Sequence, residues 1–511
     1  MNILLTGATG YLGKHLLAAM LHAGHRVTAL VRGGSAARLT AALAPFTLPA
    51  AALVAPRLEV LAGDVTAPGC GAGGQALPAG GYFDAFVHCA GLTRFDAHLA
   101  AEATLHNLAG TRHAHALARR LAIPAFHHLS TAYVAGRADA PFGPCDLDVG
   151  QAFNNPYEQS KFEAERWLHG VAGRDGMALT VYRPSIVVGG HPIGENQAVS
   201  TVYTFMKAVQ FIRECCRRDA ESGRGRFAAL GFVRDGEDFH MPVRVAADPA
   251  STVNLVAVDD VVDAVLGGLA APAQAGGVRT AQLTGSDVTL AAMERAICGG
   301  MRLGGVRLVP AAAFVAEPRN ALEAHFERMT QVYAPYLFHS PRFTGARAAR
   351  PVDPARLTRD YLALARPGRR SARPTVGALA LGTLGIRAPR DYFDALVGGA
   401  VGRHFLAQHD YVDAAVGFSL GGAAPCDVRL RFAGGSAHEL PAGDTAELDC
   451  RYALDSGLFM RIVHGETDLR AAFLAGKVKV QGDIELALKF GALLGQYYNR
   501  IDEHVIAELT A

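Results

Sequence analysis

The stretch MNILLTGATGYLG, residues 1–13, contains three glycines at a spacing of three residues after an apolar run. Its first five residues form a short apolar run that is typical of a buried strand, and the residues after it continue with the apolar spacing of a helix. Between them, Gly7 permits a tight turn, Gly10 lets the backbone approach a pyrophosphate, and Gly13 allows close packing of helix on strand. The order predicts a dinucleotide-binding βαβ unit with the phosphates at the helix amino terminus. The predicted nucleotide-binding residues of this turn are Thr6, Gly7, Thr9, Gly10, Tyr11, Leu12 and Gly13.

A second strand is predicted at residues 25–31, at the distance that a βαβ unit requires. Units that bind NAD usually carry an acid at the end of this strand for the ribose hydroxyls, whereas this chain has Arg32 there and Arg38 soon after. A guanidinium group can pair bidentately with the 2′-phosphate, so the two arginines favour NADPH as the cofactor. The alternative is that both are ordinary surface arginines.

Two further strands are expected at residues 58–61 and 83–88. The first ends at Asp64, where a carboxylate could hold the adenine amino group, and the second ends beside the expected cofactor. Together they add Asp64, Val65, Cys89, Ala90 and Gly91 to the predicted nucleotide site.

Composition limits the class of protein. The chain has 511 residues, of which 50% are hydrophobic, so two or three domains are expected. A net charge of +2 argues against a general nucleic-acid binder. The eight cysteines show no Cys-x-x-Cys pair and no paired Cys/His spacing, so we expect reduced thiols and no metal site. No apolar run of transmembrane length or signal peptide is present, which predicts a soluble, cytoplasmic protein.

The stretch FNNPYEQSKFEAER, residues 153–166, places a phenol and an amine one helical turn apart. Residues four positions apart on a helix lie about 5 to 6 Å from each other at Cβ, so Tyr157 and Lys161 can reach a common target. A tyrosine, with a pKa near 10, is a poor acid-base group at neutral pH unless a cation stabilises its phenolate, and Lys161 would be that cation. The alternative is a solvated helix face.

Five motifs in order resemble the extended short-chain dehydrogenase/reductase superfamily over about residues 1–310: TGATGYLG, VHCAG, HLSTAYVAG, NNPYEQSKFEAE and VYRPSIVVG. They are most similar to its male-sterility branch, which contains fatty acyl-CoA reductases and thioester reductase domains. The resemblance implies that Lys161 holds the nicotinamide ribose and that a hydroxyl, Thr131 rather than its neighbour Ser130, completes a catalytic set with Tyr157. It also assigns Pro184, Ser185 and Ile186 to the cofactor, together with Tyr157 and Lys161.

The branch implies NADPH-dependent reduction of an acyl thioester, carried by CoA or a carrier protein, to an aldehyde and onward to an alcohol if a second hydride follows. Residues 201–212 could line an acyl channel, although a core helix is the commoner interpretation. The basic residues 213–226 are interpreted as a solvated loop rather than a phosphate site. Two alternatives stay open: a dehydrogenase of sterols or other lipophilic carbonyls, and a lipid- and NADPH-binding protein without activity. A homodimer is also left open.

The last third of the chain predicts a second fold. Residues 365–374, rich in proline, glycine and arginine, indicate a linker after a helical segment. Residues 428–432 and 446–452 alternate as strands do, and residues 477–480 are strand-like and precede a helical pattern at 484–494. Over about residues 390–500 this order resembles the sterol carrier protein family, which implies a bound lipid or acyl chain. A generic α+β dimerisation domain is the alternative.

The predicted fold class is therefore α/β: a Rossmann-type, doubly wound parallel sheet with substrate-binding insertions, plus a carboxy-terminal α+β domain like a lipid carrier. The expected domains are residues 1–310 for the NADP-binding reductase, 311–375 for a helical segment and linker, and 376–511 for the sterol carrier-like domain.

Overall fold

The computed structural model divides into two compact units, Met1–Arg366 and Pro367–Ala511. It describes residues 1–72, 80–172, 174, 176–189, 201–221, 227–272, 274–345, 350–364, 386–407, 413–441, 447–463, 467, 469–474, 476–483, 486–487 and 490, without some helical side chains, among them that of Arg38. The linker expected at residues 365–374 lies outside these ranges, as does most of the helix expected at 484–494. No helix in the described part is long and apolar enough to cross a membrane.

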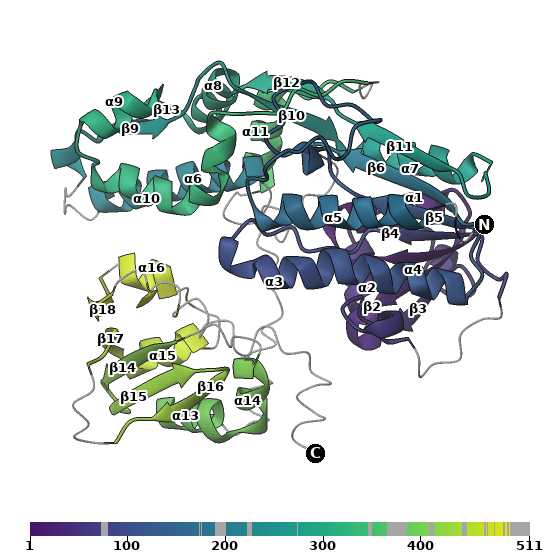
Figure 1. Ribbon diagram of the computed structural model, residues 1–511. Coiled ribbons are helices and arrows are strands. Elements are labelled where there is room, and N and C mark those ends of the chain that lie inside the picture. Colours follow the sequence, from purple (N-terminus) through teal and green to yellow (C-terminus); the bar gives the residue numbers. More distant parts are fainter. Residues whose placement is uncertain are drawn as a thin grey trace. The chain divides into compact units, whose positions relative to one another are not determined.

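A parallel sheet of seven strands forms the centre of the first unit (Figure 1). Its order is β11-β6-β5-β4-β1-β2-β3, and every neighbouring pair is parallel. The strands are β1 (Asn2–Thr6), β2 (Arg26–Val31), β3 (Leu58–Ala62), β4 (Ala85–His88), β5 (Ala125–Leu129), β6 (Ala178–Pro184) and β11 (Val278–Leu283). The predicted doubly wound α/β fold is thus confirmed.

Helices cover both faces of this sheet, which explains the unbroken apolar run of the first strand. Ile3 and Leu5 face a core shared with α1, α2 and α7, whereas Leu4 faces a core shared with α4 and α5. A strand buried on both faces needs apolar residues at every position rather than at alternate ones. The helices are α1 (Tyr11–His22), α2 (Ala36–Leu43), α3 (Ala100–Ala103), α4 (Gly110–Arg120), α5 (Pro156–Val171) and α7 (Val258–Ala270).

The insertions form a separate apolar core in the same unit. Two small sheets contribute to it, β12-β10-β7 and β13-β9-β8. Their strands are β7 (Ile186–Val188), β8 (Val233–Asp235), β9 (Asp238–Ala246), β10 (Thr252–Ala257), β12 (Ser286–Thr289) and β13 (Leu303–Val309). The helices are α6 (Thr201–Glu221), α8 (Leu290–Met301), α9 (Ala311–Ala316), α10 (Ala321–Thr330) and α11 (Pro354–Leu364), with the 3-10 turn η8 (Gln331–Leu337).

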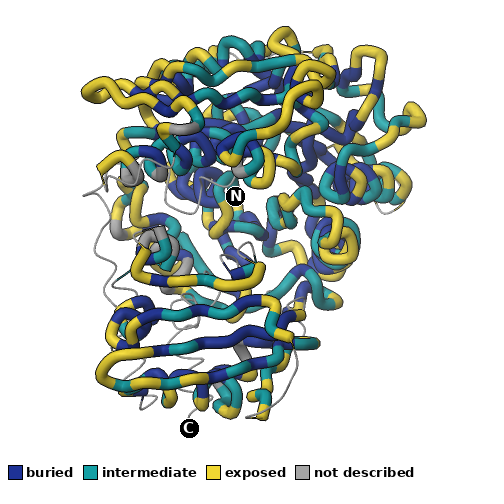
Figure 2. Tube along the Cα trace, turned by 90° about the vertical axis from the view of Figure 1, so that its left-hand side faces the viewer, coloured by how far each residue is buried: buried dark blue, intermediate teal, exposed yellow. Residues whose placement is uncertain are grey.

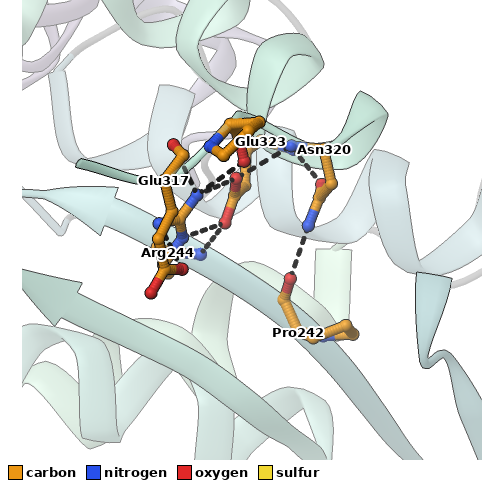
Figure 3. A network of polar contacts seen from close by, with 6 residues as sticks. Pro242, Arg244, Glu317, Asn320 and Glu323 are labelled. Carbon is orange, nitrogen blue, oxygen red and sulfur yellow. Dashed lines mark hydrogen bonds and ion pairs between the residues drawn. The ribbon is translucent and has the colours of Figure 1, made fainter. Parts of the chain in front are cut away.

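A polar network fastens α10 to β9 (Figure 3). The Arg244 guanidinium pairs with Glu323 at 2.8 Å and with Glu317 at 2.9 Å. Asn320 caps α10 by accepting the Glu323 N–H at 2.9 Å, and its amide donates to the Pro242 carbonyl at 2.9 Å. These contacts fix the segment that precedes η8, which borders the site described below.

Helix α6 answers two expectations from the sequence. Most apolar residues between 201 and 212 are buried in the core of the insertions, which is the core-helix alternative. The loop expected at residues 213–226 is wrong up to Glu221, because α6 continues that far. Arg217 pairs with Glu214 at 2.7 Å and Glu221 at 2.5 Å, spacings of three and four residues that stabilise a helix.

The second unit contains a five-stranded sheet in the order β16-β15-β14-β17-β18, in which only the β14–β17 pair is parallel. Its strands are β14 (Ala414–Gly421), β15 (Cys426–Ala433), β16 (Ser436–Glu439), β17 (Cys450–Asp455) and β18 (Val478–Gly482). The described helices are α13 (Pro389–Gly398), α14 (Ala400–Ala407), α15 (Ser456–Val463) and α16 (Leu469–Leu474). An aromatic core joins sheet and helices, including Phe393, Phe418, Tyr452 and Phe459. Burial alternates along β15 and β17, whereas β14 is buried at most positions (Figure 2). The α+β prediction is confirmed.

Candidate active site

The glycine turn between β1 and α1 is packed so closely that side chains are excluded. Gly7 has a positive φ of 76°, and a Cβ there would lie 2.6 Å from the Ala90 amide nitrogen. A Cβ on Gly13 would lie 2.0 Å from the Gly7 carbonyl oxygen. Gly10 is exposed and caps α1 without a side chain, and Thr9 is exposed beside it. The amino terminus of α1 is therefore open to an anion such as a pyrophosphate.

Three other predicted residues of this turn have side chains that contact the protein itself. The buried Thr6 hydroxyl accepts the Ala90 N–H at 3.2 Å and contacts the His88 ring at 2.8 Å. The Tyr11 hydroxyl donates to the Gly189 carbonyl at 2.5 Å, and Leu12 packs on the core beneath the sheet. The Thr6 side chain is thus engaged within the protein and supports the turn instead of facing a nucleotide.

Arg32 and Asp64 lie together at the carboxyl ends of β2 and β3. Arg32 is exposed in the 3-10 turn η1 (Arg32–Gly34). Burial raises the pKa of Asp64, but hydrogen bonds from Thr66 and the charges of Arg32 and His106 outweigh it and lower the pKa below its usual value. Val65 is buried beside them. Arg38 lies in α2, and its side chain is outside the described part.

The residues after β4 and β6 border the part of the site where the sequence predicts the nicotinamide. Cys89, Ala90 and Gly91 follow β4, and a Cβ on Gly91 would lie 3.9 Å from the Lys161 Nζ. Burial raises the pKa of the Cys89 thiol to about 12, so this cysteine stays protonated. Pro184 ends β6, Ile186 begins β7, and the buried Ser185 hydroxyl between them has no partner among the described residues.

Tyr157 stands in the first turn of α5, where Asn155 caps the helix by accepting the Glu158 N–H at 3.0 Å. Burial raises the pKa of Tyr157 to about 12, while a hydrogen bond with the Thr131 side chain lowers it in part. The Thr131 hydroxyl is itself held near the Pro184 carbonyl at 3.4 Å and accepts the Tyr133 N–H at 3.2 Å. The structure thus brings Thr131 and Tyr157 together.

Lys161 is buried next to them, and its ammonium donates to the Leu129 carbonyl at 2.5 Å. Burial lowers the pKa of Lys161 to about 8. The expectation that Lys161 lowers the pKa of Tyr157 does not hold in this arrangement, because the cost of burying a phenolate dominates. Tyr157 is consequently a phenol at neutral pH.

Ser130, the alternative hydroxyl, is directed elsewhere. It donates to Glu165 at 2.6 Å, and Glu165 forms an ion pair of 2.6 Å with Arg183 in which both side chains are fully buried. This network supports the strand end that carries Thr131, and it leaves Thr131 as the hydroxyl beside the phenol.

Two features of the site escaped prediction. The first is Asn107 in a π-helical turn, η5 (Thr104–Ala109), whose amide donates to Ser160 at 2.9 Å, and Ser160 in turn donates to the Tyr157 carbonyl at 3.0 Å. A single asparagine in a helical pattern gives no signal of this contact. π-helical turns occur frequently at functional sites.

The second is an aromatic wall over Tyr157. The Phe95 ring stacks on it with centroids 5.5 Å apart, and Tyr333 and Tyr336 of η8 contact Phe95 at 5.3 and 5.8 Å. The Tyr336 hydroxyl donates to Glu158 and accepts from the Asn155 amide at 2.7 Å, which pins η8 to the start of α5. These rings lie far apart in the sequence, so local patterns could not group them.

Comparison with known proteins agrees with this geometry. Residues 5–224 match the model of the male sterility protein family, and residues 412–495 match that of the SCP-2 sterol transfer family. In two strains of Mycobacterium tuberculosis, a 3 beta-hydroxysteroid dehydrogenase/Delta 5→4-isomerase is 29% identical over 190 residues, 37% of this chain and 47% of each relative. The polyketide synthase-nonribosomal peptide synthetase ACE1 of Pyricularia oryzae is 29% identical over 279 residues, 51% of this chain and 6% of that protein. The chain therefore spans about half the length, or much less, of these curated relatives.

Among solved structures, the terminal R domain of the myxalamid PKS-NRPS pathway is similar, with a TM-score of 0.53 and 23% identity over 71% of this chain and 90% of that one. This likeness shows the fold of the first unit. Residues 5–224 are accordingly similar to the male sterility protein family, and residues 412–495 to the SCP-2 sterol transfer family.

Proposed function

We propose that this protein uses NADPH to reduce an acyl thioester, carried by CoA or a carrier protein, to an aldehyde. The observation that carries the proposal is the hydrogen-bonded pair of Thr131 and Tyr157 beneath an aromatic wall, with Lys161 behind it. The similarity to ACE1, which is named as a polyketide synthase-nonribosomal peptide synthetase, favours a carrier-bound substrate.

The choice of NADPH rests on the end of β2. An exposed arginine, Arg32, stands where an NAD-binding unit would place an acid, and its charge acts on the neighbouring Asp64. A guanidinium suits a 2′-phosphate, which NADH lacks.

The chemistry of the side chains fits a reduction. When bound, NADPH would supply a hydride to the carbonyl carbon of the thioester. Thr131 and Tyr157 would donate hydrogen bonds to the oxygen as it becomes negative, and such donors contribute about 3 to 4 kcal/mol each. A phenol with a pKa of about 12 is protonated at neutral pH, so Tyr157 can give its proton to that oxygen. The hemithioacetal then breaks its C–S bond, and the thiol and the aldehyde leave.

The carboxy-terminal domain is proposed to hold the lipophilic chain of the substrate. The family that it resembles is named for sterol transfer, and aromatic and aliphatic residues from sheet and helices build its core. Burial of an alkyl chain contributes about 0.8 kcal/mol per CH₂ group, which is enough to retain a long chain.

A second candidate is a dehydrogenase of sterols or related carbonyls, which the hydroxysteroid dehydrogenases among the relatives favour. The two can be separated by following NADPH oxidation at 340 nm with a panel of acyl-CoA and carrier-bound thioesters and, in parallel, with ketosteroids. The proposal expects oxidation with thioesters that disappears in Tyr157→Phe. Oxidation with ketosteroids alone would favour the second candidate.

A further inference from the structure

A chain of buried hydrogen bonds runs through His88, at the end of β4, outside the set of residues that face the substrate. His88 is 1% exposed, and its Nδ1 lies 2.8 Å from the Thr6 hydroxyl. Its Nε2 lies 3.2 Å from the Thr111 hydroxyl on α4. Both ring nitrogens are therefore engaged, on two elements that are 105 positions apart in the chain, from Thr6 to Thr111.

The number of hydrogens fixes the direction of the chain. The Thr111 hydroxyl gives its one hydrogen to the Asn107 carbonyl at 2.6 Å, so it accepts from His88 Nε2–H. Nδ1 then carries no hydrogen and accepts from Thr6, whose oxygen accepts the Ala90 N–H at 3.2 Å. His88 is thus neutral, in the Nε2–H form, and every donor in the chain meets an acceptor.

One end of the chain reaches the nucleotide turn. Thr6 is the last residue of β1, directly before Gly7, and Ala90 is the residue against which Gly7 packs most closely. The hydrogen bond that Thr6 donates to His88 therefore holds β1 and the end of β4 in the register that shapes the glycine turn.

The other end reaches the catalytic helix. The Asn107 backbone carbonyl accepts the hydrogen bond from the Thr111 hydroxyl. The Asn107 side chain forms two hydrogen bonds with the Leu92 backbone, at 2.8 and 3.0 Å, and donates to Ser160. Ser160 donates to the carbonyl of Tyr157. A displacement of Thr111 would therefore shift the π-helical turn and, through Ser160, the first turn of α5.

The surroundings keep His88 uncharged. Burial, and then the charge of Lys161, lower the pKa of His88 to about 3. His128 stacks on the ring at 5.6 Å, and neither of its nitrogens has a hydrogen-bond partner among the described residues. The neutral imidazole of His88 can therefore serve as a fixed donor and acceptor at neutral pH.

We propose that His88 is a positioning residue that couples the nucleotide turn to the Tyr157 helix, with its Nδ1 serving the first and its Nε2 the second. Its importance for catalysis rests on the proposed function, but the Thr6 link and the Thr111 link can each be measured without turnover.

Two substitutions separate the two links. The Asn side chain places an oxygen where Nδ1 stands and has no group at Nε2, so His88→Asn keeps the acceptor for Thr6 and loses the donor to Thr111. His88→Gln places an amide nitrogen near Nε2 and loses the acceptor for Thr6. The matched controls are His128→Asn and His128→Gln, which make the same changes of size on the neighbouring strand β5, at the position paired with His88. Thr111→Val removes the hydroxyl that accepts from His88 Nε2, so it breaks the same hydrogen bond as His88→Asn. It replaces His88→Asn if that variant does not fold.

The readouts are the Kd of NADPH by fluorescence and the amide hydrogen exchange of residues 104–110 and 156–162. His88→Gln should raise the Kd about tenfold, the usual effect of leaving one buried donor unpaired, with exchange near wild type. His88→Asn and Thr111→Val should speed exchange in both segments and leave the Kd within about twofold. Equal effects of both His88 variants on both readouts, or effects no larger than those of the His128 controls, would overturn the proposal. Absence of thioester turnover would affect the proposed function and leave this comparison intact.

Discussion

The ring of Phe95 lies over the ring of Tyr157 with centroids 5.5 Å apart and an interplanar angle of 20°. Phe95 lies in the segment after β4 and Tyr157 in the first turn of α5, so this stack joins that segment to the helix that carries Lys161. Because Tyr333 and Tyr336 touch the same ring, the wall is continuous with η8.

Removal of the Phe95 ring should weaken substrate positioning more than cofactor binding. Aromatic pairs contribute about 0.5 to 1.5 kcal/mol beyond burial, so Phe95→Ala should lower kcat/KM for a long-chain thioester about twofold to twelvefold. Phe95→Tyr, which keeps the stack, is the control. Steady-state kinetics with a fixed, saturating NADPH concentration would measure this. An unchanged kcat/KM in the alanine variant would show that the wall does not touch the substrate.

Arg32 should decide between the two nicotinamide nucleotides. Arg32→Ala should raise the Kd of NADPH about tenfold or more and leave that of NADH nearly unchanged, because a charged hydrogen bond to phosphate contributes about 1.5 to 3 kcal/mol. The exposed Arg26, at the opposite end of β2, is the matched control. Isothermal calorimetry with both nucleotides provides the values. A wild type that binds NADH as tightly as NADPH would refute the assignment.

Burial of Lys161 should appear as a pH-dependent term in stability. The pKa of Lys161 is about 8 in the folded protein and about 10.4 in an unfolded chain. Between these pH values the unfolded state binds a proton that the folded state does not. The contribution of Lys161 to the free energy of unfolding therefore increases as the pH rises from 8 to about 10.4.

The stability of Lys161→Met relative to wild type should therefore fall between pH 7.5 and 10, on the order of 2 kcal/mol. Urea unfolding of both proteins at several pH values isolates the term, since all other groups are shared. A constant difference over this range would mean that the amine is not desolvated. The same variant should lose reductase activity.

The buried pair of Glu165 and Arg183 should be costly to break from one side. Glu165→Gln leaves the fully buried guanidinium without its charge partner and should destabilise the protein by about 3 to 5 kcal/mol. The double variant Glu165→Gln, Arg183→Met should recover part of that loss, which a denaturant series would reveal. Equal stability of single and double variants would contradict the coupling.

The sequence predicted those parts of the site that depend on local geometry. Gly7 and Gly13 could be interpreted because their spacing along one strand, turn and helix determines the contacts. Tyr157 and Lys161 are one helical turn apart, so their shared face followed from the period. The fold class could be predicted for the same reason, from runs and periods.

The remainder depends on contacts between distant segments. Asn107 meets Ser160 across 53 positions, and Tyr336 meets Glu158 across 178, so no local pattern could indicate either. The pKa of Tyr157 was expected to fall because a cation is near in sequence, yet it rises because burial, a property of the whole packing, is the larger effect. Residues 213–221 appeared as a charged loop, and their ion pairs instead extend a helix.

The decisive measurement uses NADPH deuterated at C4 on the transferred face and a long-chain thioester. Mass spectrometry of the aldehyde shows whether the label has moved to the product. Hydride transfer at this site should place one deuterium on the carbonyl carbon for each NADPH oxidised to that stage, and Tyr157→Phe should give no labelled product. An unlabelled aldehyde, or thioester loss that proceeds equally well in Tyr157→Phe, would contradict hydride transfer at the Thr131–Tyr157–Lys161 site.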